Sequence, residues 1–149
     1  MPPRNCQYTW ARCGAGPIRC RLRSKLDKYL VVLAGAGLGG LARYVVGTSI
    51  MSKYGGRFPL GTFIINITGS FLIGVLMTLF LERLQPHPAW RLFLVVGVLG
   101  GYTTFSSFEY ETYQAVRDGA RLMGLIYVAG SVVLGYLGVW LGAVLATRR

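Results

Sequence analysis

The segment 97–108, GVLGGYTTFSSF, combines residue types that could bind an ion inside a membrane. Its adjacent glycines, Gly100 and Gly101, together cost about 2 kcal/mol of helix propensity relative to alanine, so a helix through this segment is predicted to unwind there. Backbone that is not helical persists at membrane depth only where protein buries it or where it lines a wet cavity. We therefore predict a functional helix break whose freed main-chain carbonyls can hold a fixed cation.

Two aromatic residues shortly after the glycines indicate a second kind of ligand. Phe105 and Phe108 are three positions apart and share a helix face. The edge of an aromatic ring is electropositive, so ring edges that point into a pore are weak ligands for an anion. Thr104 and Ser107 place hydroxyl donors beside them. Two phenylalanines at this spacing more often belong to a core or contact lipid, and that alternative stays open.

Uncharged polar side chains recur at helical spacing in two other segments. Thr62, Asn66 and Ser70 are four positions apart, as are Tyr127 and Ser131, so each set follows one face of a helix. Such rows either hydrogen-bond neighbouring helices, at less than about 2 kcal/mol per bond, or line a path for a solute that accepts hydrogen bonds. By themselves these rows favour hydrogen bonds between helices. Together with the segment 97–108, they favour a path for a solute instead.

Composition indicates the environment of these groups. The chain of 149 residues is 53% hydrophobic, with a mean hydropathy of +0.48. Only 14% of its residues are charged, whereas about a quarter is usual in soluble domains. These values indicate an integral membrane protein. The net charge of +11 comes largely from basic residues near the N-terminus and at the ends of apolar segments, which suits a partner lipid bilayer and not a nucleic acid.

Four hydrophobic segments must position the polar groups: 29–50, 59–81, 90–116 and 122–146. Each is long enough for a helix that crosses a bilayer core of about 30 Å, which takes about 20 residues. The connections are short and force antiparallel neighbours. We predict an all-α membrane protein with a four-helix transmembrane domain over 28–149. The segment 1–27 is predicted to be a basic, disordered extension, whose three cysteines lack the spacing of a zinc site.

Ionisable side chains are scarce within these segments. Arg43 lies near one end of the first, where it either extends to the headgroups or draws anions into a vestibule. Glu109 and Glu111 occur late in the third, near an interface. The middle of each predicted span lacks a carboxylate, which counts against a proton-coupled exporter. A pore with so few charges suits an anion, because cation filters use rings of carbonyls or carboxylates.

The predicted bundle is too small to enclose a path for a polar solute, so we expect a homo-oligomer. Outside the extension, basic residues divide equally between the two membrane faces, which is compatible with insertion in both orientations. Glycine pairs at four-residue spacing predict close helix contacts, namely Gly35/Gly39, Gly97/Gly101 and Gly138/Gly142.

Three motifs make the chain resemble the Fluc (CrcB) family of fluoride channels: GGLARY at 39–44, GTFIINITGSF at 61–71, and the segment 97–108. The resemblance covers residue 28 to the C-terminus, although Ser107 stands where the family often has threonine. It implies an antiparallel, dual-topology homodimer with two pores, in which backbone carbonyls of Gly100 and Thr103 bind a structural sodium ion between the chains. The anion pathway that it implies comprises Asn66, Thr104, Phe105, Ser107, Phe108, Tyr127 and Ser131, with Arg43 and Glu111 in a vestibule.

The function that this resemblance implies is passive export of fluoride across the bacterial plasma (inner) membrane. Hydrofluoric acid crosses membranes as a neutral molecule and dissociates in the cytoplasm, and a selective channel lets the membrane potential drive the trapped anion out. The alternative is a small four-helix multidrug or cation exporter, which would need a glutamate that the segment 29–50 lacks. An enzyme is not expected, because the four segments contain no pair of nucleophile and base.

Overall fold

The computed structural model describes residues 25–147, and within this range every long element is a helix. The first span is α1 (Lys25–Tyr54), and the second is α2 (Leu60–Thr78) with its continuation η1 (Leu79–Arg83). The third comprises α3 (Pro88–Arg91), η2 (Leu92–Leu99), α4 (Gly100–Tyr102) and α5 (Phe105–Arg117), and the fourth is α6 (Arg121–Thr147). All four are long and apolar enough to cross a membrane, which confirms the predicted all-α membrane fold.

The observed spans contain the predicted ones with small differences at their ends. Helix α1 begins at Lys25, so the residues 25–27, which the sequence assigned to the extension, form its first turn. The rest of that predicted disordered extension, residues 1–24, lies outside the described residues. The elements η1 and η2 are π-helices, whose wider turns often occur near functional sites. The longer of them, η2, leads directly into the broken part of the third span.

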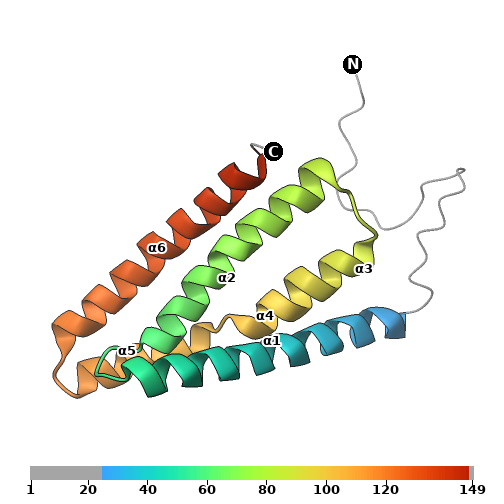
Figure 1. The fold of residues 1–149 in the computed structure, drawn as a ribbon. Helices are drawn as coiled ribbons and strands as arrows, with labels where there is room; N and C mark the ends of the chain where they lie inside the picture. Colours follow the sequence, from blue (N-terminus) through green and yellow to red (C-terminus); the bar gives the residue numbers. More distant parts are fainter. Residues whose placement is uncertain (1–24, 148–149) are drawn as a thin grey trace, which may run out of the picture.

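Two pairs of neighbouring helices make up the bundle (Figure 1): α2 packs against α6, and α1 packs against η2 and α4. The helices approach closely because glycines face the backbone of the opposite helix. A Cβ atom at Gly35 would lie 2.5 Å from the Phe93 carbonyl oxygen, and one at Gly101 would lie 2.5 Å from that of Ala36. Gly142 contacts the backbone of α2 in the same way. The predicted glycine contacts are therefore confirmed.

This packing leads to a test on α1. A Cβ atom at Gly39 would overlap the Val98 carbonyl oxygen and lie 2.9 Å from the Tyr102 nitrogen, whereas one at Gly37 would meet no atom within 4 Å. We expect Gly39→Ala to destabilise the protein by about 1–3 kcal/mol, as overpacking does. Gly37→Ala should be neutral or stabilise it by up to about 1 kcal/mol through helix propensity. Thermal unfolding in detergent measures both, and equal transition temperatures would contradict the close contact.

The third span breaks at Thr103 and Thr104, not at the glycine pair. Gly100 and Gly101 are helical, whereas Thr103 (φ −79°, ψ 156°) and Thr104 (φ −148°, ψ 118°) are extended. The predicted break therefore exists, but its predicted position was wrong by three residues. A Cβ atom at Gly101 would lie 2.5 Å from the Ala36 carbonyl oxygen of α1, so this glycine allows close helix packing and does not break the helix.

Candidate functional site

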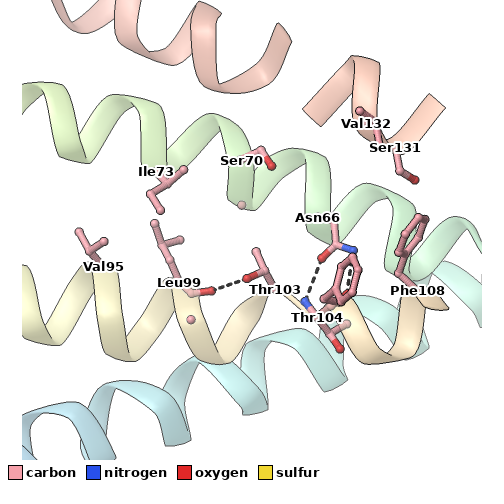
Figure 2. A pocket seen from close by; sticks show the side chains of 13 residues that line it. Asn66, Ser70, Ile73, Val95, Leu99, Thr103, Thr104, Phe108, Ser131 and Val132 are labelled. Carbon is pink, nitrogen blue, oxygen red and sulfur yellow. Dashed lines mark hydrogen bonds between the residues drawn. The ribbon is translucent and has the colours of Figure 1, made fainter. Parts of the chain in front are cut away.

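The break in the third span is held open by one side chain of α2 (Figure 2). The Thr104 N–H donates to Asn66 Oδ1 (2.9 Å), and Asn66 Nδ2 donates to the Thr104 carbonyl oxygen (3.0 Å). The amide of Asn66 thus replaces hydrogen bonds that a continuous helix would form with its own backbone. One N–H of Nδ2 is left over, because an amide nitrogen carries two. The sequence predicted Asn66 as a pathway residue and did not indicate this structural role.

Hydroxyl groups complete both ends of the break. Thr103 Oγ1 donates to the Leu99 carbonyl oxygen (3.0 Å) at the end of the first half. Thr104 is the N-cap of α5, since its Oγ1 accepts from the Ser107 N–H (3.3 Å) and donates to Ser107 Oγ (3.0 Å). A capping hydroxyl satisfies one of the free N–H groups at a helix start. Side-chain hydrogen bonds therefore stabilise the ends of both helical halves of the third span at the break.

A cavity of about 380 Å³ lies beside the break, and Figure 2 shows the side chains around it. For convenience we call it the break cavity. Five elements contribute to its wall, namely α2, η2, α4, α5 and α6. Of the predicted pathway residues, five line it, namely Asn66, Thr104, Phe105, Phe108 and Ser131. Its wall is mostly apolar, with amide and hydroxyl groups spaced along it and no ionisable residue.

Phe105 and Phe108 both line the break cavity but differ in exposure. Their ring centroids are 5.9 Å apart. Phe108 is 7% exposed and packs on the ring of Tyr127 at 5.0 Å, whereas Phe105 is 74% exposed in the single chain. Phe108 thus has a fixed position inside the bundle. Phe105 lies at the surface, where it can contact both the cavity and whatever covers it.

Ser131 differs from the other polar groups of this cavity. Its Oγ atom is buried and has no hydrogen-bond partner among residues 25–147. A buried hydroxyl without a partner is costly, typically about 1–3 kcal/mol, and such groups in native proteins usually bind water or a ligand. The Ser131 hydroxyl can therefore donate a hydrogen bond to a ligand that binds in the break cavity.

Tyr127, which the sequence predicted as a pathway residue, is buried and bound to Glu111. It is 1% exposed, and its hydroxyl donates to Glu111 Oε2 (2.7 Å), while Thr62 Oγ1 donates to Glu111 Oε1 (2.7 Å). Its place in a row with Ser131 is real, but it does not line the break cavity. The sequence placed Thr62 in one polar row with Asn66, but its hydrogen bond to Glu111 was not predicted.

A second cavity, of about 320 Å³, brings the predicted vestibule residues together. Arg43 and Glu111 both line it, as do Thr62, Thr104 and Ser107. Thr104 also borders the break cavity, so the two spaces share this residue. We call the second one the vestibule cavity. The predicted site residues therefore line these two cavities, except Tyr127, whose hydroxyl donates to Glu111.

Main-chain oxygens at the break are suitable ligands for a hard cation. In a continuous helix the Thr104 N–H would bond to the Gly100 carbonyl, but here it is taken by Asn66. Gly100 and Thr103 both border the break cavity. Within the described part of the chain no cluster of three or more His, Cys, Asp or Glu residues could bind a metal. Carbonyl and hydroxyl oxygens are thus the donors that this region offers.

Comparisons with known proteins agree with this arrangement. Residues 30–143 match the family described as "CrcB-like protein, Camphor Resistance (CrcB)". A protein of Solibacter usitatus named "Fluoride-specific ion channel FluC" is 63% identical over 121 residues, which make up 81% of this chain and 99% of that relative. Relatives of the same name from Acidobacterium capsulatum and Coxiella burnetii are 50% and 44% identical, over 81% and 80% of this chain and 97% of each relative. The resemblance drawn from three motifs is confirmed, and the chain belongs to the CrcB-like protein family.

Proposed function

We propose that this protein is a fluoride-selective ion channel that exports cytoplasmic fluoride by passive electrodiffusion and so lowers fluoride toxicity. The break cavity is the observation that carries the proposal. It places the buried Ser131 hydroxyl, which has no hydrogen-bond partner in the described part of the chain, in one space with the rings of Phe105 and Phe108. The relatives with the name "Fluoride-specific ion channel FluC" support the identity of the ion.

The chemistry of the cavity wall favours a small anion. A bare ion in a medium of low dielectric constant costs tens of kcal/mol, so the protein has to replace its water. Ser131 Oγ and the second N–H of Asn66 Nδ2 can donate to it, and the electropositive ring edges of Phe105 and Phe108 add weaker contacts. The wall carries no carboxylate that would attract a cation instead.

Passive movement is sufficient for export. A membrane potential of 100 mV contributes about 2.3 kcal/mol for each elementary charge that crosses it. Because hydrofluoric acid enters as a neutral molecule and dissociates inside, the anion accumulates in the cytoplasm and the potential drives it out. In this proposal the four spans lie in the bacterial plasma membrane. The protein acts as a channel and catalyses no chemical reaction.

A second copy of the chain completes the pathway in this proposal. Phe105 is largely exposed, although it lines the break cavity, so one chain leaves this side of the cavity open. An antiparallel homodimer would cover it and agrees with the equal division of basic residues between the two membrane faces. A sodium ion between the chains would be held by the carbonyls of Gly100 and Thr103 from both. When bound, it supplies a fixed positive charge beside the anion pathway.

The alternative of a multidrug or cation exporter has less support. Such a protein needs a carboxylate that exchanges protons for a bulky cation. Glu111 is the carboxylate that lines the vestibule cavity, and its two oxygens accept hydrogen bonds from Thr62 and Tyr127, respectively. It lines the vestibule cavity but not the break cavity. The family match also favours the channel.

Flux measurements on purified protein test the proposed function directly. Liposomes that contain only this chain are loaded with potassium fluoride or potassium chloride, and valinomycin is added to carry the potassium. We expect rapid fluoride release and a chloride release no faster than from liposomes without protein. Chemical crosslinking of the same sample should show a dimer. Equal release of both halides, or uptake of a cationic dye driven by a proton gradient, would contradict the proposal.

A further inference from the structure

A third cavity extends the path from the vestibule cavity to the end of the bundle. It has a volume of about 530 Å³, and it shares Met51, Pro59 and Glu111 with the vestibule cavity. Its outer wall comes from the connection between α1 and α2 and from the connection between α5 and α6. Figure 1 shows both connections at the same end of the bundle. We call this third space the mouth, because these connections and the adjoining ends of the spans line it.

Two carboxylates line the mouth, and negative charge there opposes the approach of an anion. Glu111 lies where the mouth meets the vestibule cavity, and Asp118 lines the mouth as well. Asp118 is paired with Arg117, whose Nε lies 3.3 Å from its Oδ1, so its charge is partly offset. Among the residues that the structure describes, Glu111 accepts hydrogen bonds from the neutral hydroxyl groups of Thr62 and Tyr127 and forms no ion pair. Its carboxylate would therefore repel an anion that approaches from this end.

Arg57 is the one cation among the residues that line the mouth. It lies in the connection between α1 and α2, is exposed, and forms no hydrogen bond or ion pair within the described range 25–147. Within that range no carboxylate forms an ion pair with its guanidinium. An unpaired guanidinium in a concave, partly enclosed space raises the local concentration of anions, because low-dielectric walls concentrate its field.

We propose that Arg57 recruits the permeating anion at the mouth and offsets the repulsion by Glu111. Its charge thereby raises the rate at which the anion passes through the pathway. This inference rests on the proposed function, since it assigns the residue to the anion route. In this proposal Arg57 attracts the anion to the mouth and is not one of the groups that bind it at the break. Its effect is electrostatic, and it must therefore depend on ionic strength.

The test compares fluoride flux through full-length variants in liposomes at two ionic strengths set by an impermeant salt. The Debye length is about 30 Å at 0.01 M and about 3 Å at 1 M, so the charge is felt across the mouth only in dilute salt. We expect Arg57→Gln to lower the flux about two- to fivefold in dilute salt and by less than about 1.5-fold at 1 M. Arg57→Lys should keep most of the flux, and Arg57→Glu should lose more than Arg57→Gln.

Lys53→Gln is the matched control. It removes the same charge from an exposed residue in the last turn of α1, and Lys53 lines none of the three cavities. It should change the flux by less than half as much as Arg57→Gln. Equal losses in the two variants, an unchanged flux in Arg57→Gln, or a loss that is the same at both ionic strengths would overturn the inference. If the wild-type protein carries no fluoride, the proposed function fails too, whereas a conducting wild type with an unchanged Arg57→Gln removes only the role of Arg57.

Discussion

Asn66→Asp is expected to abolish fluoride flux and to destabilise the break in the third span. The change puts a carboxylate oxygen in place of Nδ2, which lies 3.0 Å from the Thr104 carbonyl oxygen, so two acceptors face each other. Loss of this partly buried hydrogen bond costs about 1–3 kcal/mol of stability. In addition, a negative charge about 5 Å from a permeating anion raises its energy by about 3 kcal/mol at an effective dielectric constant of 20, which corresponds to more than a hundredfold in rate.

Liposome flux and thermal unfolding in detergent separate these two effects. Asn66→Leu serves as the control, because it removes both hydrogen bonds to Thr104 without adding a charge. We expect it to lose stability to a similar extent and to retain more flux than Asn66→Asp. A variant Asn66→Asp that conducts like the wild type would place this residue outside the anion pathway. Unchanged unfolding in both variants would mean that the amide does not hold the break.

Phe108→Ile is expected to reduce fluoride flux about tenfold while the protein still folds and forms its dimer. Isoleucine keeps much of the apolar volume but lacks the electropositive ring edge. If that edge contributes about 1.4 kcal/mol to the anion in the pathway, its loss corresponds to a factor of ten. Some stability is also lost, since the ring of Phe108 packs at 5.0 Å on that of Tyr127. The flux assay, with gel filtration and crosslinking of the same sample, measures both consequences.

Phe63→Ile is the appropriate comparison for this variant. Phe63 belongs to the same aromatic cluster, with its ring 6.2 Å from that of Tyr127 and 5.4 Å from that of Phe58, but it lines none of the three cavities. We expect it to cost stability and little flux. If both variants lose flux alike, packing explains the effect. If Phe108→Ile conducts normally, ring edges have no part in anion passage.

Much of the fold could be predicted from the sequence because the relevant signals are local. The length of each apolar segment determines that it can cross a bilayer, and short connections determine that neighbouring helices run antiparallel. The four-residue spacing of Thr62, Asn66 and Ser70 placed them on one face of α2, and all three contribute to the wall of a cavity. The motifs sufficed for the family as well, which the comparisons confirm.

The partners of Glu111 were not predictable in this way. Its carboxylate is bound by Thr62 of α2 and by Tyr127 of α6, which are 49 and 16 positions away in the chain. The sequence placed Glu111 near a vestibule and Tyr127 in a polar row beside Ser131. Only the packing of α2, α5 and α6 directs the Tyr127 hydroxyl towards this carboxylate, because each helix can rotate about its axis without changing its own hydrogen bonds.

The sequence alone thus determined that there are four apolar spans, that the third is interrupted, and which residue types lie near the interruption. The tertiary structure decided where the interruption falls. Helix propensity pointed to Gly100 and Gly101, but both are helical, and Gly101 instead lets the third span pack closely against Ala36 of α1. The chain leaves the helix at Thr103 and Thr104, where Asn66, 38 residues earlier, offers the Thr104 backbone two hydrogen bonds. A membrane helix gives up its own bonds only where another group replaces them, and that group lies on a different helix.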